Sequence, residues 1–369
     1  MAGESQIRAN VLSVNDLVDM SIIARCSTHR RLFVDFGGET PTFLLFLYDQ
    51  ERQIVYSQPE SMTQHIVPQS NTQANPLPSN ILTTPILAFL FLLPLFFPVD
   101  SQAQKQISIT FDELPVARSF DEVDAVAVNR TILAALKSHK VKATGFVVGE
   151  QIEGAYDVLG EWLNQGHRLG NGTWSGQDYN ELTPAQFISD IQQGGEALEP
   201  MLAGFGQKKR YFRFPFLHYG DTPERRKAVT PFLKDRRYIV CPATVLPEDY
   251  LYNLNLLKLG ARPDSVKFEQ LLNDYINHVL DELERVEELG RNLAGRQVKQ
   301  ILLLRANQLN SVYLDELLMA LENAGYKFIS LDEALKDKIY WRPEAYYGLK
   351  GIGYLDMIEQ SDPDLLPAK

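Results

Sequence analysis

Apolar and polar positions alternate in short runs along residues 104–369, and longer segments with a helical period separate these runs. Residues 107–111 alternate strictly between apolar and hydroxyl side chains, which predicts a half-buried strand. Residues 123–137 have the period of an amphipathic helix. Its apolar face is predicted to consist of Val126, Ile132, Leu133 and Leu136.

The same two patterns repeat along the rest of this region. Further strands are expected at residues 143–148, 238–241, 301–304 and 326–329. Further helices are expected up to residue 163 and at residues 183–201, 266–289 and 311–323. Strands that alternate with helices over roughly 250 residues predict an α/β fold with a parallel sheet, closed as a barrel or nearly so.

The first eighty residues have a different pattern. Residues 32–36 and 43–48 are expected to form two short strands around the turn at Gly37 and Gly38. Residues 61–80 are rich in Asn, Gln, Ser and Pro, which is typical of a linker. We therefore expect residues 1–80 to be an N-terminal extension of unknown role that ends in a polar linker.

Residues 81–99 are almost continuously apolar and carry no charge. Three prolines interrupt this run, and it is short for a membrane helix. Its length suits the apolar part of a secretory signal, and the small residues Ser101 and Ala103 follow it as in a cleavage site. We expect residues 81–103 to be an export signal, preceded by a non-native or misassigned extension, and the protein to be secreted or periplasmic. A membrane anchor through residues 81–99 is the alternative, ahead of a buried core segment.

The net charge argues against one class of partner, and the two cysteines argue against two kinds of site. The net charge is -11 and the isoelectric point is about 5.1, which argues against nucleic acid as a partner because phosphates need a basic face. Cys26 and Cys241 form neither a metal motif nor a disulfide framework, although a single bridge between them stays open. Nothing in the sequence indicates an oligomeric state.

Candidate chemistry lies where strands end, because parallel β/α folds place their functional side chains in the loops that follow the strands. The strand at 107–111 ends in Asp112 and Glu113. Two adjacent carboxylates cost energy unless a cation or a proton lies between them. The alternative is a solvated turn that ends at Pro115.

Four other segments also follow expected elements, at residues 166–180, 210–216, 243–250 and 305–310. Arg213 stands within a run of aromatic residues, where it can hold a carboxylate or a substrate oxygen. The alternative for Arg213 is a structural ion pair at the edge of the core.

These five segments, in this order, resemble the five motifs of the polysaccharide deacetylases, the NodB-homology enzymes of carbohydrate esterase family 4. The resemblance covers residues 104–354 and implies a distorted (β/α) barrel of the NodB-homology type at 104–369, preceded by the N-terminal extension. It rests on Thr110-Phe111-Asp112, Gly166-His167 with Gly170-Asn171, Arg213-Phe214-Pro215, Asp249-Tyr250, and Leu303-Leu304 before Arg305.

The resemblance also implies a chemistry. Enzymes of this family remove acetyl groups from N-acetylated or O-acetylated sugars with a divalent metal, often zinc, held by one aspartate and two histidines. A second aspartate acts as the base and an arginine in the third motif orients it. A histidine in the last motif is the general acid.

Carried over position by position, the resemblance yields an incomplete metal site. Asp112 matches the catalytic base, and Arg213 matches the arginine that orients it. The three metal positions are occupied by Glu113, Gly172 and Gly176, and a glycine offers no ligand.

Two further positions depart from the family pattern. Leu246 stands where the fourth motif has an aspartate. Arg305 stands at the general-acid histidine, and an arginine with a pKa above about 12 cannot exchange a proton near neutrality. Because the arginine replaces lost positive charge, we expect Arg305 to pair with Asp112 or Glu113.

A metal site can be rebuilt only from other side chains near the motifs. His167, Asp178 and His218 are the candidates. Without such a rebuilt site we expect no cofactor, and with it we expect zinc or another divalent metal.

We therefore expect a polysaccharide-deacetylase-like protein that is impaired or inactive as an enzyme and able to bind a glycan or an acetylated sugar. Its substrate-binding residues are expected to be Trp174, Phe216, Asp249 and Tyr250, with Tyr179 and Tyr219 as further candidates. Each aromatic residue can instead pack in the barrel. The alternatives for the protein are an active metal-dependent deacetylase and a non-catalytic interaction scaffold.

Overall fold

The structure, a computed structural model, describes the strands at 31–35, 43–48 and 54–55 and residues 104–117, 123–260 and 265–366. The chain divides into two units, Met1–Leu93 and Pro94–Lys369. The linker at 61–80 and the expected export signal or anchor at 81–103 lie outside the described residues.

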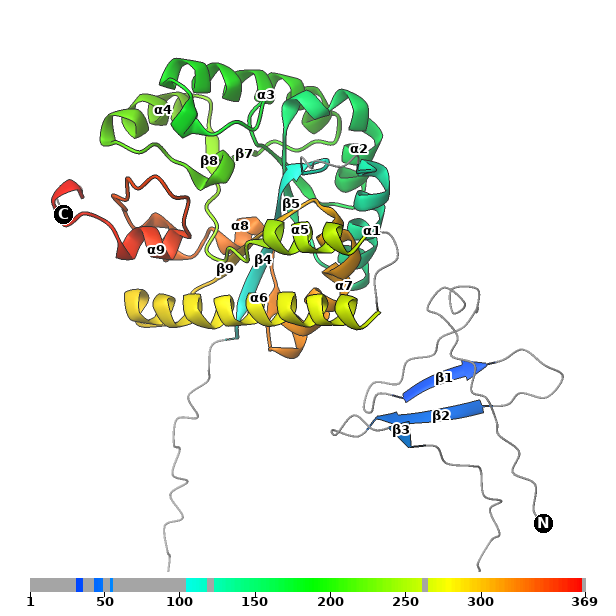
Figure 1. Cartoon of the computed structure of the whole chain (residues 1–369). Coiled ribbons are helices and arrows are strands. Elements are labelled where there is room, and N and C mark those ends of the chain that lie inside the picture. The colour runs from blue at the N-terminus through cyan, green and yellow to red at the C-terminus, as the bar shows by residue number, and fades with distance from the viewer. Residues whose placement is uncertain are drawn as a thin grey trace, which may run out of the picture. The chain divides into compact units, whose positions relative to one another are not determined.

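The first unit contains a three-stranded antiparallel sheet in the order β1-β2-β3 (Figure 1). Its strands are β1 (Arg31–Asp35), β2 (Phe43–Tyr48) and β3 (Ile54–Val55). The register pairs Arg31 with Leu47 and Asp35 with Phe43. The two strands predicted around the Gly37-Gly38 turn are thus confirmed, and β3 adds a third.

The second unit is built on seven parallel strands, as the alternation of strands and helices predicts. They are β4 (Gln106–Leu114), β5 (Thr144–Val147), β6 (Arg168–Asn171), β7 (Arg210–Phe212), β8 (Tyr238–Val240), β9 (Gln300–Arg305) and β10 (Lys327–Phe328). Strands β4 to β8 lie in chain order, while β9 and β10 both pair with β4. A parallel bridge between Val245 and Leu302 joins the segment after β8 to β9 and closes the distorted barrel.

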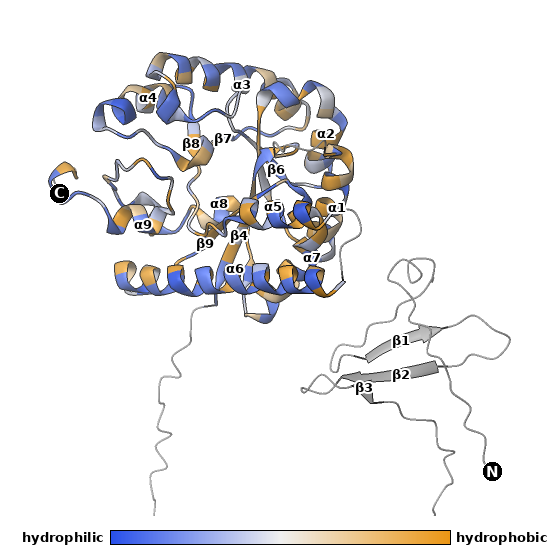
Figure 2. Cartoon of the chain, viewed as in Figure 1, coloured by the Kyte–Doolittle hydropathy of each residue, from blue (hydrophilic) through white to orange (hydrophobic). Residues whose placement is uncertain are grey.

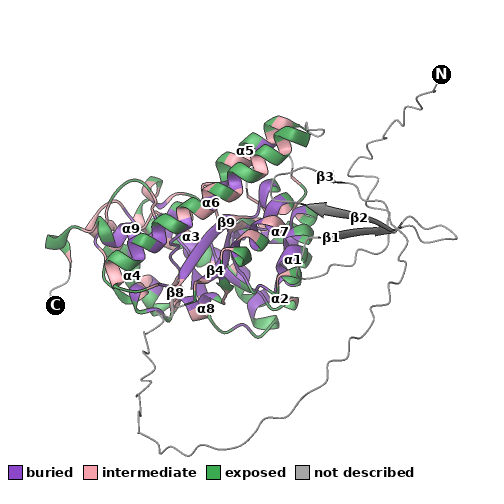
Figure 3. Cartoon of the chain, turned by 90° about the horizontal axis from the view of Figure 1, so that it is seen from below, coloured by how far each residue is buried: buried purple, intermediate pink, exposed green. Residues whose placement is uncertain are grey.

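Helices surround these strands, so that most residues of the central strands are buried and the outer helical faces are exposed (Figure 3). They are α1 (Ala125–Ser138), α2 (Tyr156–Asn164), α3 (Pro184–Gly204), α4 (Pro223–Asp235), α5 (Asp249–Leu259), α6 (Ser265–Ala294), α7 (Gln308–Asn323), α8 (Leu331–Ala334) and α9 (Tyr354–Glu359). The long helix α6 is amphipathic, with hydrophobic and hydrophilic residues in alternating bands (Figure 2). Among the described residues, no helix is long and apolar enough to cross a membrane.

The predicted apolar face of α1 is correct except at its start. Ile132, Leu133 and Leu136 are buried in the core. Val126 is 48% exposed, because it lies in the first turn, two residues after the N-cap Asp124. A helical period identifies a face, but it does not show where that face stops meeting the core.

Several elements left no sequence signal strong enough to predict them. Strands β6 and β7 have four and three residues, too few to show an alternation. Helix α4 is mostly polar and contains Pro231. Cys241 is a buried free thiol, and burial raises its pKa to about 12, while Cys26 lies outside the described residues.

Candidate functional site

Asp112 and Glu113 lie together at the carboxyl end of β4, where they line the same groove. Adjacent side chains of a regular strand point to opposite faces. Here the register between β4 and β5 shifts between Phe111 and Leu114, and Glu113 has a φ of 60°. This irregularity places both carboxylates at one site.

Arg213 holds Asp112 from the end of β7. Its Nη1 atom donates to an Asp112 oxygen at 2.7 Å and to Thr110 Oγ1 at 2.8 Å. The other guanidinium nitrogens donate to the backbone oxygens of Cys241 and Pro242, and the whole side chain is buried. Burial raises the pKa of Asp112, although the Arg213 charge opposes this.

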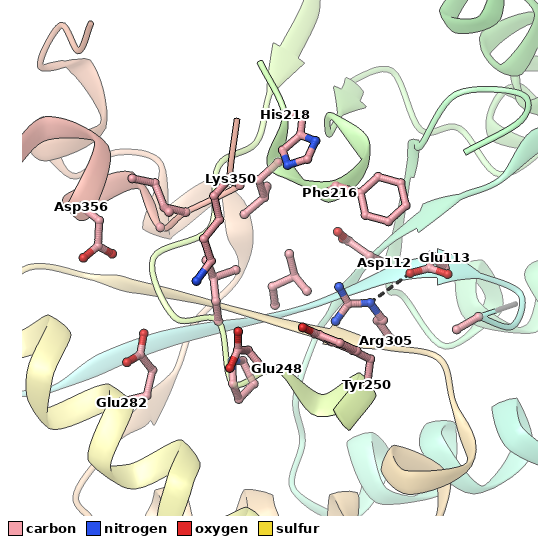
Figure 4. A pocket seen from close by; sticks show the side chains of 18 of the residues that line it. Asp112, Glu113, Phe216, His218, Glu248, Tyr250, Glu282, Arg305, Lys350 and Asp356 are labelled. Carbon is pink, nitrogen blue, oxygen red and sulfur yellow. Dashed lines mark hydrogen bonds and ion pairs between the residues drawn. The ribbon is translucent and has the colours of Figure 1, made fainter. Parts of the chain in front are cut away.

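Arg305, the last residue of β9, is paired with two carboxylates. In the parallel register of β4 and β9 it lies directly opposite Asp112. Its Nε atom lies 3.0 Å from a Glu113 oxygen and its Nη1 atom lies 2.6 Å from an Asp249 oxygen (Figure 4 shows the contact with Glu113). The predicted pairing of Arg305 with a carboxylate is confirmed, and the partner is Glu113.

Asp249, a residue of the fourth motif, is the second partner of Arg305, and this pairing was not predicted. It is 0% exposed at the start of α5, and it also accepts hydrogen bonds from the Arg305 backbone at 2.7 Å and from Asn310 Nδ2 at 2.6 Å. Burial lowers the pKa of Arg305, but the carboxylates of Asp249 and Glu113 outweigh it and raise that pKa. Burial also raises the pKa of Glu113. Asp249 therefore forms a buried ion pair with Arg305.

Gly172 and Gly176 face these charged groups across a small cavity of about 40 Å³. The backbone at both positions suits glycine. Gly176 has a φ of 65°, and a Cβ atom on Gly172 would lie 3.1 Å from the Val147 carbonyl oxygen. The loop thus brings both family ligand positions to the site without supplying a ligand.

The side chains of this site do not fit the divalent metal that the family implies. Glu113 is the only metal position that still has a carboxylate, and that carboxylate is bound to Arg305. Structural and catalytic zinc sites need at least three protein ligands. Within residues 104–117, 123–260 and 265–366, no group of three or more His, Cys, Asp or Glu side chains is arranged to hold a metal ion.

The three side chains that were candidates for a rebuilt metal site form other contacts in the structure. His218 Nδ1 lies 2.7 Å from an Asp178 oxygen, so these two side chains bind each other. His167 is buried beside Trp162, and its Nδ1 accepts a hydrogen bond from the Ala143 backbone. Burial lowers the pKa of His167 to about 4.

A groove of about 780 Å³ opens beside the charged cluster. Phe216 and Tyr250 line it and are 54% and 42% exposed. Tyr250 also packs against Arg305, with the guanidinium 5.0 Å from the ring centre.

The other expected aromatic residues pack within the fold. Trp174 lies against Gly149, where a Cβ atom would come within 2.8 Å of its ring. Tyr179 is fully buried, stacks on Phe187 at 4.3 Å and donates its hydroxyl to the Arg225 backbone. Packing, the alternative stated for each aromatic, accounts for both placements.

The groove is also lined by residues that were not predicted to belong to the site. Glu248 precedes α5, Glu282 lies on α6, and Lys350 lies in the loop before α9 (Figure 4). These three segments are distant in sequence, and only the way α6 packs along the barrel brings them together.

Part of this α/β domain is similar to the polysaccharide deacetylases. Residues 100–230 match the family model described as polysaccharide deacetylase. The α6 and Lys350 walls of the groove lie beyond the matched residues.

Two known proteins are similar in sequence. A peptidoglycan-N-acetylglucosamine deacetylase of Bacillus cereus is 31% identical over 116 residues, which make up 31% of this chain and 40% of that protein. The match thus spans less than half of that relative's length. An uncharacterized 30.6 kDa protein of Geobacillus stearothermophilus is 22% identical over 251 residues, or 68% of this chain and 78% of that protein.

Solved structures of carbohydrate esterases also match the chain. A carbohydrate esterase 4 pseudoenzyme from Bacillus anthracis aligns with a TM-score of 0.44 and 19% identity, covering 63% of this chain and 66% of that one. A peptidoglycan deacetylase from Bacillus subtilis aligns with a TM-score of 0.43 and 21% identity, covering 63% of this chain and 92% of that one.

Proposed function

We propose that this protein is a glycan-binding homologue of the polysaccharide deacetylases that lacks metal-dependent deacetylase activity. The observation that carries the proposal is the Arg305 guanidinium on Glu113, across a small cavity from Gly172 and Gly176. Positive charge from the protein itself stands beside the carboxylate that the family uses for the metal.

The remaining side chains supply only part of the chemistry of amide hydrolysis. Asp112 is held by Arg213 and can accept a proton from water. Among the described residues, no set of metal ligands is available to activate that water or to polarise an acetyl carbonyl. Arg305 cannot protonate the leaving amine, because its carboxylate partners raise its pKa. The site thus has a base, Asp112, but neither a metal to polarise the carbonyl nor an acid to protonate the amine, so we expect hydrolysis to be slow.

Glycan binding is supported by the groove. Its volume of about 780 Å³ lies within the usual range for ligand sites, and most of its exposed wall is apolar. Phe216 and Tyr250 present exposed aromatic faces, on which the apolar faces of sugar rings can stack. The Bacillus cereus relative acts on peptidoglycan N-acetylglucosamine by its name, and we propose amino-sugar polymers as the ligand class.

The test is a set of three measurements on the purified protein, namely metal content, acetate release from N-acetylglucosamine oligomers, and calorimetric binding of the same oligomers. We expect substoichiometric metal, acetate release at the level of a blank with or without added zinc, and saturable binding. Stoichiometric zinc together with acetate release would instead establish an active deacetylase. Absence of any glycan binding would leave the interaction scaffold.

We also propose that the protein is exported, since polymers of this class lie outside the cytoplasm. The support is the apolar run at 81–99 followed by small residues. Deleting 81–99 is expected to retain the protein in the cytoplasm on cell fractionation. An unchanged distribution would contradict export through this segment.

A further inference from the structure

We propose that the groove selects glycans with free amines, that is, de-N-acetylated amino sugars, over their N-acetylated counterparts. This inference rests on the proposed glycan binding and adds the charge of the ligand. A protonated amine is a cation, whereas an acetamido group is neutral. The distinction therefore depends on the electrostatics of the groove.

Carboxylates outnumber cations along the groove. The acidic side chains that line it are Asp112, Glu113, Glu248, Glu282 and Asp356. The basic side chains are Arg285, Arg305 and Lys350. An apolar groove with an excess of negative charge favours a ligand that combines apolar ring faces with positive charge.

Both arginines are already neutralised by acidic partners. Arg305 binds Glu113 and the buried Asp249. Arg285 binds Glu282 at 2.8 Å and Asp356 at 2.7 Å. Each guanidinium thus faces two carboxylates, which leaves one negative charge at each end of the groove.

The charged cluster at the base of the groove contains one of these two excess charges. Asp112, Glu113 and Asp249 oppose only Arg213 and Arg305. A proton or a bound cation has to balance the third carboxylate.

Glu248 is the side chain best placed to meet an amine. It lines the groove directly before α5, two residues from Tyr250 (Figure 4). In the described part of the chain its carboxylate has no hydrogen bond and no ion pair. A sugar ring stacked on Tyr250 can therefore present its ammonium to a carboxylate that still lacks a partner.

Lys350 acts in the opposite direction. It extends into the same groove, and among residues 104–117, 123–260 and 265–366 its ammonium forms no ion pair (Figure 4). This cation competes with a ligand amine for the acidic walls. Removing its charge should therefore strengthen the selection.

The experiment compares three oligomers of equal length by calorimetry, made of glucosamine, N-acetylglucosamine and glucose, at a pH below the pKa of the sugar amine. We expect glucosamine oligomers to bind about tenfold more tightly than the other two, which corresponds to one or two favourable charge contacts. Added salt should weaken only the glucosamine complex, because screening acts on the charge term.

Three charge variants complete the test. Glu248→Gln should weaken glucosamine binding about fivefold, and Lys350→Gln should strengthen it by a similar factor. Glu284→Gln is the matched control, because Glu284 is exposed on α6 two positions from Glu282 and therefore on another side of the helix. It should leave binding unchanged.

The outcomes separate the two proposals. Equal affinity for the three oligomers, or preference for N-acetylglucosamine, overturns the selection of amines and leaves glycan binding intact. Equal effects of Glu248→Gln and Glu284→Gln also overturn it. Absence of binding to every oligomer overturns this inference and the proposed function together.

Discussion

Arg305 Nε lies 3.0 Å from a Glu113 oxygen, although 192 positions separate the two residues in the chain. The parallel register of β4 and β9 brings them together, since it sets Arg305 opposite Asp112. The guanidinium is then fixed by Asp249 from the start of α5. The site thus contains a permanent cation that belongs to the core of the barrel.

Replacing Arg305 should destabilise the protein. Arg305→Met removes the cationic partner of Asp249, which is fully buried. We expect a loss of about 3 kcal/mol in the free energy of unfolding, measured with urea, because an uncompensated buried charge remains. Arg210→Met is the control and should cost less than about 1 kcal/mol, since Arg210 and Glu199 form an exposed pair.

A double-mutant cycle checks the cause of that loss. Asp249→Asn in the Arg305→Met background removes the stranded charge, so the double variant should be more stable than the sum of the single losses by about 1 kcal/mol or more. Strict additivity of the two losses would show that the ion pair is not what Arg305 contributes.

The stability of the protein should depend on pH through Asp112. Burial raises its pKa in the folded state above the unfolded value, so its favourable contribution is present at low pH and is lost as the pH rises through the folded pKa. Asp112→Asn cannot titrate. The stability of the native protein relative to this variant should therefore fall as the pH rises from acid toward neutrality.

Asp337 serves as a control, because its contribution to stability should change with pH in the opposite direction. Burial raises its pKa, but the hydrogen bonds from Arg296 and from the backbone of Ile339 and Lys299, with the Arg296 charge, together outweigh burial and lower it. Its stabilising contribution is present above the unfolded pKa and is lost as the pH falls through the folded one. Relative to Asp337→Asn, the native protein should lose stability in acid. The same slope for both comparisons would refute the assignment for Asp112.

Any side chain at Gly176 should lower the stability of the protein. Gly176 has a φ of 65°, so Gly176→Ala should cost about 1 kcal/mol in unfolding free energy. Gly154→Ala is the matched control, because nothing lies within 4 Å of a Cβ atom there. It should change stability by less than about 0.5 kcal/mol. A cost at Gly154 as large as that at Gly176 would mean that backbone conformation is not the cause.

Restoring the family residues should restore some chemistry. The combined variant Gly172→His, Gly176→His, Glu113→Asp, Leu246→Asp and Arg305→His supplies two imidazoles, the metal aspartate and the general acid around the same cavity. We expect it to bind zinc and release acetate from N-acetylglucosamine oligomers, while the parent does neither. The strain at Gly176 should make the variant less stable. Equal acetate release by both proteins would show that the motif positions are wrongly assigned.

The aromatic rims of the groove should contribute to glycan affinity. Phe216→Ala and Tyr250→Ala should each weaken oligomer binding about tenfold in calorimetry, because each removes an exposed stacking face. Phe205→Ala is the control, since Phe205 is 42% exposed, as is Tyr250, and follows α3 outside the groove. A tenfold loss in the control as well would point to a general effect on the fold.

Long periodic elements were predictable and short ones were not. The alternation at 107–111 and the helical periods at 183–201 and 266–289 predicted β4, α3 and α6, because their packing repeats over many residues. Strands β6 and β7 gain their stability from neighbours on both sides, so their own few residues carry little signal. The prediction that Val126 belongs to the buried face of α1 was wrong for a related reason. The helical period continues to the start of the helix, whereas the contact with the core ends before it.

The groove shows the same limit at the level of the site. Phe216 and Tyr250 belong to motif segments and were predicted to contact a sugar. Glu248 lies in a motif segment but was not predicted to belong to the site. Glu282 and Lys350 line the same space from segments that carry no recognisable motif. A pattern along the chain records neighbours in sequence, whereas a groove wall is made by elements that pack side by side.

The sequence by itself determined which groups are missing from the site. Gly172 and Gly176 carry no ligand in any fold, and Arg305 stays protonated wherever it lies. Only the tertiary structure decided that Glu113 and Asp249 share the guanidinium, and that Asp112 is left to Arg213. The physical reason is that the irregularity in β4 and the parallel register with β9 set these distances, and both depend on how the strands pair around the barrel.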